Sequence, residues 1–179
     1  MVNFNKLSII IPAYNEAKTI HQILNLLNEV KLINGIEKEL IVVNDCSTDN
    51  TEEVLLQYRS EHPQLNIQYF KHDVNQGKGA AIHTGIKNAG GEWLVIQDAD
   101  LEYDPEEFNE LLKPVVRGAA DVVFGSRFQG GNPHRILFYW HSIGNKLLTR
   151  LSNMFTNLNL TDMETGYKLC KTSTIRSLD

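Results

Sequence analysis

Short apolar runs alternate along this chain with longer amphipathic segments, and this alternation constrains the fold more than any other feature of the sequence. A run such as Leu7-Ser-Ile-Ile-Ile11 is too short for a helix and is typical of a buried strand. A segment such as Thr19 to Val30 places its apolar residues at the spacing of one helix face. The predicted strands cover residues 7–11, 39–43, 66–70, 93–96 and 121–124, and the predicted helices begin near residues 19, 49, 77, 104 and 147. This order predicts an α/β domain with a mainly parallel sheet.

Polar residues follow four of the predicted strands at the point where each strand ends. Pro12-Ala-Tyr-Asn-Glu16 follows the first strand, and Asn44-Asp-Cys-Ser-Thr-Asp49 follows the second. Gln97-Asp-Ala-Asp100 and then Glu102 follow the fourth, and Gly125-Ser-Arg127 follows the fifth. Because ligands of such sheets bind outside the carboxyl ends of the strands, we expect these residues to meet in one site.

Asp98 and Asp100 are the candidate metal ligands. Two carboxylates at this spacing can share one Mg²⁺ or Mn²⁺, which prefers oxygen ligands and keeps open positions for phosphate. Such a metal neutralises a diphosphate leaving group. Glu102 is a candidate third ligand. The alternative is that all of these carboxylates are solvated acids in a loop between a strand and a helix.

Three further positions suit a nucleotide. The carboxylate of Asp45 can accept hydrogen bonds from a base or ribose, or it can simply cap a turn. Tyr14 can face a base, and Glu16 can bond a ribose hydroxyl. Asn75-Gln-Gly-Lys-Gly-Ala-Ala81 places Lys78 and backbone amides at a helix start, which favours an anion or, alternatively, close helix packing. That motif is shorter than a P-loop and lacks its Ser or Thr after the lysine.

Composition excludes one class of partner. The formal net charge is -5, whereas nucleic-acid binding needs a basic face, so we expect no nucleic acid partner. Cys46 and Cys170 have no metal-ligand spacing, which is typical of reduced thiols in a cytoplasmic protein. The sequence shows neither a signal peptide nor an apolar stretch of roughly 20 residues. Residues 1–179 are long enough for one domain.

Taken together, five motifs resemble glycosyltransferase family 2. They are Ile9-Ile-Ile-Pro-Ala-Tyr-Asn-Glu16, Val42-Val-Asn-Asp-Cys-Ser-Thr-Asp49, Asn75-Gln-Gly-Lys-Gly-Ala80, Gln97-Asp-Ala-Asp100 and Gly125-Ser-Arg127. The resemblance implies the GT-A fold, a Rossmann-like three-layer sandwich with a mainly parallel central sheet. It also implies that residues 1–179 are a single catalytic domain, and the abrupt end at Asp179 suggests truncation at the C-terminus.

The resemblance also implies roles for single residues. Asp98 and Asp100 would bind the metal and the diphosphate, with Asp100 acting in catalysis. Arg127 would lie near the donor phosphates or the sugar. Asp162 matches an acid that is catalytic in some relatives, and we interpret its role as orienting the acceptor. The nucleotide site would be lined by Pro12, Ala13, Tyr14, Glu16, Asp45, Lys78 and Asp98.

The segment Asp162-Met-Glu-Thr-Gly-Tyr-Lys168 resembles the branch of dolichyl-phosphate mannose synthases and bacterial polyprenyl-phosphate glycosyltransferases. That branch implies inverting, metal-dependent transfer of a hexose from a nucleoside-diphosphate sugar to a polyprenyl phosphate at the membrane surface. The protein would be cytoplasmic and peripheral at the inner face of the membrane, with an aromatic segment around Phe138-Tyr-Trp140 as one contact. A saccharide acceptor and a non-catalytic nucleotide-sugar binding module remain the alternatives. The family often has Asp-Asp where this chain has Asn44-Asp45. The sequence does not distinguish UDP from GDP donors.

Overall fold

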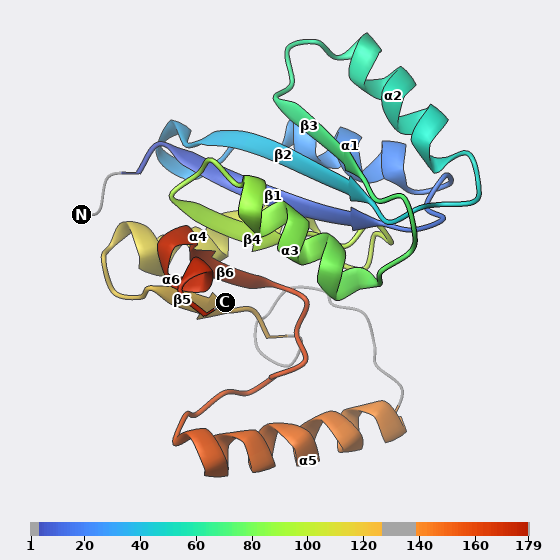
Figure 1. Cartoon of the computed structure of the whole chain (residues 1–179). Helices are drawn as coiled ribbons and strands as arrows, with labels where there is room; N and C mark the ends of the chain where they lie inside the picture. Colours follow the sequence, from blue (N-terminus) through green and yellow to red (C-terminus); the bar gives the residue numbers. More distant parts are fainter. Residues whose placement is uncertain (1–3, 127–138, 179) are drawn as a thin grey trace.

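A computed structural model describes residues 4–126 and 139–178. Its strands are β1 (Lys6–Ala13), β2 (Glu37–Asn44), β3 (Ile67–Lys71), β4 (Trp93–Ile96), β5 (Val122–Phe124) and β6 (Lys168–Lys171). They form one sheet in the order β3-β2-β1-β4-β6-β5 (Figure 1). The pairs β1–β2, β1–β4 and β2–β3 are parallel, whereas β6 runs antiparallel to both β4 and β5. The prediction of a mainly parallel sheet is confirmed.

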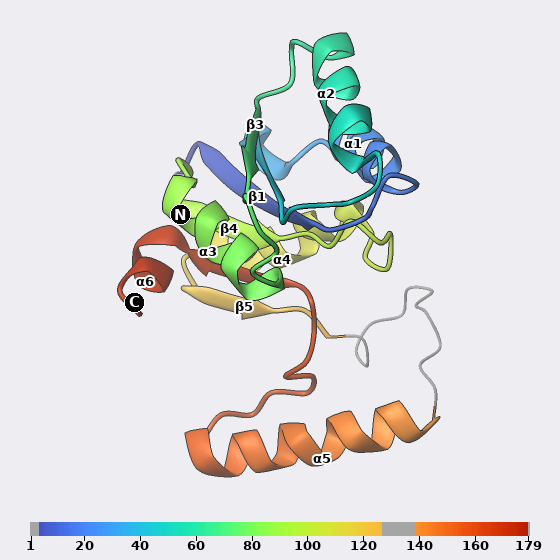
Figure 2. The same cartoon turned by 45° about the vertical axis from the view of Figure 1, so that its right-hand side comes forward.

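Helices cover both faces of this sheet. They are α1 (Ile20–Glu29), α2 (Thr51–Glu61), α3 (Lys78–Asn88), α4 (Phe108–Val116), α5 (Tyr139–Thr156) and α6 (Thr172–Arg176), with 3-10 turns η1 (Ile33–Gly35) and η2 (Pro105–Glu107). Buried residues of α1, α2 and α4 share one core cluster with the sheet, and those of α3 lie in a second cluster, against which Ile175 of α6 also packs. These two clusters, on opposite faces, give the predicted three layers. Figures 1 and 2 show α5 standing apart from the layers.

The central strand β1 shows why the strand sequences are almost continuously apolar. Leu7, Ile9 and Ile11 belong to the cluster that contains α1, while Ile10 belongs to the one that contains α3. All four side chains are fully buried. A strand covered by helices on both faces has no solvent side, so its sequence lacks the polar alternation of a half-exposed strand.

A side-chain cap marks the start of the turn that leads into α4. The Asp104 carboxylate accepts a hydrogen bond from the backbone N–H of Glu106 at 3.0 Å, and Pro105 occupies the first position of the turn. This first turn is a 3-10 turn, which continues directly into α4. The cap therefore fixes where the chain turns after the acidic loop 97–103.

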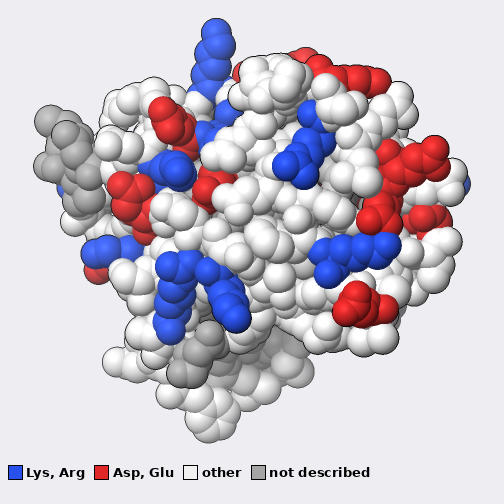
Figure 3. All heavy atoms as spheres, turned by 45° about the horizontal axis from the view of Figure 1, so that its top comes forward, with Lys and Arg blue, Asp and Glu red and all other residues white. Residues whose placement is uncertain are grey.

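Charges of both signs are distributed over the surface. On the face drawn in Figure 3, basic and acidic side chains of the described residues are interspersed. Within the described part of the chain, no helix is both long enough and apolar enough to cross a lipid bilayer.

Close packing of α3 against β1 leads to a stability prediction. A Cβ atom added at Gly85 would overlap Cγ2 of Ile10, whereas one added at Gly79, on the same helix, would meet nothing within 4 Å. We expect Gly85→Ala to lower the free energy of unfolding by roughly 1–3 kcal/mol, because the helix must move away from the sheet. Gly79→Ala should raise it by up to about 1 kcal/mol through helix propensity. Urea denaturation of the two variants measures both changes, and equal stability would contradict the close packing.

Candidate active site

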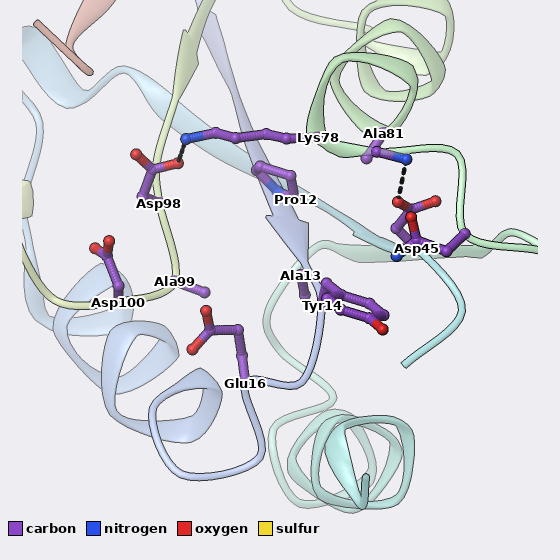
Figure 4. Close-up of a pocket in the computed structure, with 12 residues that line it drawn as sticks. Pro12, Ala13, Tyr14, Glu16, Asp45, Lys78, Ala81, Asp98, Ala99 and Asp100 are labelled. Atoms are coloured by element: carbon purple, nitrogen blue, oxygen red, sulfur yellow. Dashed lines mark hydrogen bonds and ion pairs between the residues drawn. The ribbon is translucent and has the colours of Figure 1, made fainter. Parts of the chain in front are cut away.

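A pocket lies at the carboxyl ends of β1, β2 and β4, beside the start of α3 (Figure 4). Three of the four polar segments that the sequence places after strands contribute to it, together with the glycine-rich segment before α3. The lining residues are Pro12, Ala13, Tyr14, Glu16, Asp45, Asn75, Gly77, Lys78, Ala81, Asp98, Ala99 and Asp100. The structure thus brings together all of the residues predicted for the nucleotide site, and it adds Asn75, Gly77, Ala81 and Ala99.

Asp98 and Asp100 border the pocket from the loop after β4 (Figure 4). Lys78 reaches from the first residue of α3 to Asp98, where its Nζ lies 2.5 Å from Oδ1. The Asp100 carboxylate is oriented by a 3.0 Å hydrogen bond from the backbone N–H of Glu102. Two hard carboxylates at the edge of an open pocket suit Mg²⁺ or Mn²⁺, and the flexible, mostly exposed Lys78 can move from Asp98 to a phosphate.

Glu102 differs from Asp98 and Asp100 in its position relative to the pocket. Its side chain is exposed, and it is not among the residues that line the pocket. Among the side chains that the structure describes, those of residues 4–126 and 142–178, no three His, Cys, Asp or Glu are grouped so that they could hold one metal ion. The predicted set of three carboxylates is therefore not assembled in this structure, and Asp98 and Asp100 form the candidate site.

Asp45 is buried at the opposite end of the pocket. Its Oδ1 accepts hydrogen bonds from Nδ1 of His72 at 2.7 Å and from the backbone N–H of Gln76 at 2.9 Å. Its Oδ2 accepts from the backbone N–H of Gly77 at 2.7 Å. Burial acts to raise the pKa of Asp45, but the bonds from Gln76, His72 and Gly77 outweigh it and hold that pKa below its usual range. The carboxylate therefore acts only as an acceptor at neutral pH.

His72 is a further residue of the site that no sequence motif indicates. Its ring bonds Asp45 through Nδ1 and lies 2.8 Å from Oγ1 of Thr84 through Nε2. Its position along the chain could have identified it, because His72 directly follows β3. In the structure, its backbone N–H donates to the carbonyl of Asn44 at 2.9 Å. A site residue therefore follows the carboxyl end of the third strand, as it does for the first, second and fourth strands.

Asn44 stands where the family often has an acid, and its contacts explain the amide. Its Oδ1 accepts from the backbone N–H of Ser47 at 2.9 Å, and its Nδ2 donates to the hydroxyl of Tyr69 at 3.2 Å. The Tyr69 hydroxyl in turn donates to Glu52 at 2.9 Å. An ionised aspartate could accept from Ser47 but could not donate to Tyr69. Asn44 therefore supports the loop after β2 from behind.

The loop that carries Asp98 is held from β6. The hydroxyl of Tyr167, just before β6, donates to Oε1 of Gln97 at 2.7 Å. Gln97 donates through Nε2 to the carbonyl of Asp98 at 3.0 Å. Burial raises the pKa of Tyr167 far above its usual range, so its hydroxyl remains a neutral donor. The last strand therefore positions the acidic loop.

The structure does not show Asp162 or Arg127 in the pocket. The carboxylate of Asp162 is buried and accepts a 2.7 Å hydrogen bond from Nδ2 of Asn145 on α5. Asp162 is not among the residues that line the pocket. Arg127 and Phe138 lie outside the described residues, and α5 begins at Tyr139. The catalytic roles of Asp162 and Arg127 remain predictions.

Comparison with known proteins gives one family. A model of glycosyl transferase family 2 matches residues 8–178. A dolichyl-phosphate beta-glucosyltransferase of Trichomonas vaginalis is 36% identical over 176 residues, which are 91% of this chain and 52% of that protein. A dolichol-phosphate mannosyltransferase of Pyrococcus furiosus is 31% identical over 135 residues, which are 75% of this chain and 37% of that protein. The chain thus spans about half or less of these relatives.

Among solved structures, a mannosyltransferase from Pyrobaculum calidifontis in complex with GDP-Man and Mn²⁺ is similar to this chain. The two share 25% sequence identity and superpose with a TM-score of 0.58, over 68% of this chain and 35% of that one. The likeness agrees with the three-layer architecture described above.

Proposed function

The chain belongs to glycosyl transferase family 2, and on that basis we propose that it transfers a hexose from a nucleoside-diphosphate sugar to a polyprenyl phosphate. The observation that carries the proposal is the pocket that joins Asp45 at one end to Asp98 and Asp100 at the other. Both curated relatives act, by name, on a dolichyl or dolichol phosphate, which supports the lipid phosphate as acceptor.

In this proposal the two ends of the pocket bind the two ends of the donor. Asp45, Tyr14 and Glu16 take the nucleoside, and Lys78 with Asp98 and Asp100 takes the diphosphate. Asp98 and Asp100 would hold Mg²⁺ or Mn²⁺, which supplies positive charge to the leaving diphosphate. The related mannosyltransferase in complex with GDP-Man and Mn²⁺ supports a divalent metal. Lys78 adds a second positive charge on the same side.

The acceptor chemistry requires no strong base. An oxygen of the lipid phosphate attacks the anomeric carbon from the side opposite the diphosphate, and the bond to the diphosphate breaks with inversion. Because that phosphate oxygen is already ionised, no proton has to be removed. Asp162 is therefore not needed as a base, and in this proposal it orients the acceptor. Its hydrogen bond from Asn145 joins it to α5.

A direct assay tests this function. Purified protein is incubated with Mn²⁺ and, in turn, UDP-glucose, UDP-N-acetylglucosamine and GDP-mannose. The acceptor is either a short-chain polyprenyl phosphate or a free saccharide, and products are identified by mass spectrometry. We expect one donor to give a polyprenyl-phosphate hexose. Transfer to a free saccharide, but not to the lipid phosphate, would overturn the acceptor. Binding of a donor with neither hydrolysis nor transfer would favour the binding module.

The unusual orientation of α5 supports an acceptor at a membrane surface. The polar side of this helix faces the rest of the chain, where Asn145 is 3% exposed and Thr149 donates to it at 2.9 Å. The apolar side faces solvent, and Phe155 is 81% exposed. The helix has no acidic residue, whereas Lys146 and Arg150 are exposed on it. The outward apolar residues of the described part of α5 are Ile143, Leu147, Leu148, Leu151, Met154 and Phe155.

An apolar face flanked by basic residues suits the surface of an anionic bilayer. We expect the protein to sediment with vesicles of mixed phosphatidylcholine and phosphatidylglycerol. Phe155→Glu should weaken this binding roughly tenfold or more, because a buried aromatic ring contributes about 1.5–3 kcal/mol. Thr156→Glu adds the same charge next to it, at an exposed residue outside the apolar face, and should weaken binding much less. Equal losses in the two variants would contradict contact through the apolar face.

A further inference from the structure

The hydrogen bonds at Asp45 leave room for one donor from a base, and from this we infer that the nucleotide is a uridine diphosphate and not a guanosine diphosphate. The inference rests on the proposed function, since it assumes that a nucleotide occupies the pocket with its base at Asp45. It concerns the choice of donor, which neither the motifs nor the family decides.

Three of the acceptor positions of the Asp45 carboxylate are already used. An ionised carboxylate offers about four positions for hydrogen bonds, two on each oxygen. On Oδ1 of Asp45 both are used, by His72 and by the N–H of Gln76. On Oδ2 one is used, by the N–H of Gly77. One position on Oδ2 therefore remains, and Asp45 lines the pocket.

The three existing donors are held in place. The ring of His72 is mostly buried and is bonded at both nitrogens, to Asp45 and to Thr84. The other two donors are consecutive backbone amides, and Gly77 has a φ of 87°, in the left-handed region that favours glycine. Freeing Oδ1 for a ligand would require this turn or the buried imidazole to move.

Uracil, guanine and cytosine present different donors and acceptors to this carboxylate. The edge of uracil that pairs with other bases carries a single donor, N3–H, between two carbonyl oxygens. The corresponding edge of guanine carries two adjacent donors, N1–H and the N2 amino group. Cytosine has no hydrogen at N3, so it would face the carboxylate with an acceptor. One open position on an acceptor-only carboxylate satisfies uracil, leaves one donor of guanine unpaired, and repels cytosine at N3.

The chain also offers a partner for a carbonyl of uracil. Asn75 lines the pocket two residues before Gly77, and its side-chain amide can donate to a carbonyl oxygen. The pocket can therefore pair N3–H of uracil together with one of its neighbouring carbonyl oxygens. Guanine has a carbonyl oxygen beside N1–H as well, so the choice between the two bases depends on the second donor of guanine, its N2 amino group.

Calorimetric titration of the unmodified protein with four nucleotides in Mn²⁺ buffer tests the inference. The ligands are UDP, N3-methyl-UDP, GDP and CDP, which share the diphosphate and differ at the base. We expect UDP to bind about tenfold or more tightly than each of the others, because each of them leaves a polar group unpaired or lacks the N–H. GDP binding as tightly as UDP, or N3-methyl-UDP binding like UDP, would overturn the uridine assignment alone. Absence of binding by all four would overturn the nucleotide site and the proposed function with it.

A pair of variants tests the reason for the preference. His72→Phe keeps a ring but removes the donor to Oδ1, so it should open a second acceptor position and reduce the ratio of GDP to UDP dissociation constants severalfold. Thr84→Val removes the partner at the far side of His72 without uncovering Asp45, and it should keep the wild-type ratio. An unchanged ratio in folded His72→Phe, checked by its thermal unfolding, would contradict the role of His72. The four-ligand comparison on the unmodified protein stands whether or not the variants fold.

Discussion

Replacing Asp100 by alanine should lower Mn²⁺-dependent transfer by roughly 10²-fold or more, the largest loss of activity that we expect from one substitution. The Asp100 side chain borders the pocket, and its orientation is fixed by the N–H of Glu102. Asp98 already shares its charge with Lys78, at 2.5 Å. Without Asp100, the loop after β4 keeps only Asp98, which forms a nearly neutral pair with Lys78 and attracts a divalent cation weakly. The measurement is the initial rate at increasing Mn²⁺ concentrations.

Two other acids separate a metal effect from a general charge effect. Glu110→Ala removes one negative charge from the exposed surface of α4, where Glu110 pairs with Lys113 at 2.5 Å, and it should leave the rate unchanged. Glu102→Gln tests the third predicted ligand and should lose less activity than Asp100→Ala, because Glu102 lies outside the pocket lining. A normal rate and normal Mn²⁺ dependence in Asp100→Ala would remove the metal assignment. A loss of activity in Glu102→Gln as large as that in Asp100→Ala would support the original prediction that Glu102 is a third metal ligand.

The largest loss of stability should follow Glu39→Ala, at the opposite end of β2 from the pocket. Glu39 is 3% exposed. It accepts hydrogen bonds from Ser8 Oγ at 2.6 Å, Gln68 Nε2 at 2.9 Å and the N–H of Gly90 at 2.7 Å. Removing the carboxylate leaves these donors without their acceptor beneath a packed sheet. We expect the free energy of unfolding to fall by roughly 3–5 kcal/mol, measured by urea denaturation.

Glu37 provides the matched control, because it has the same side chain on the same strand and is exposed. Glu37→Ala should change the free energy of unfolding by less than about 0.5 kcal/mol. The folded fraction of Glu39→Ala should bind UDP as the wild type does, since the pocket lies at the other edge of the sheet. Equal stabilities of the two variants would show that the buried network around Glu39 contributes little.

The positions of most pocket residues could be predicted because they depend on strand ends. Asp45 and Asp98 follow buried apolar strands by one or two residues, and parallel strands bring their carboxyl ends to one edge. His72 obeys the same rule, but its strand, β3, is not a continuous apolar run, and a histidine there has no motif around it. The predicted third ligand, Glu102, shows the limit of the rule. It lies close in sequence to Asp100, yet its side chain does not line the pocket.

The sequence by itself determined the alternation of strands and helices, the burial of β1 on both faces and the edge at which the polar residues gather. These properties can be predicted from short-range periodicity, because the spacing of apolar residues depends on whether one or both faces of an element are buried. Only the tertiary structure decided that β6 inserts antiparallel between β4 and β5, that Lys78 pairs with Asp98, and that α5 turns its apolar side outward. It alone also showed that three donors already occupy the carboxylate of Asp45. The number of hydrogen bonds that a side chain still has to offer depends on which distant segments pack against it, and sequence spacing does not contain that information.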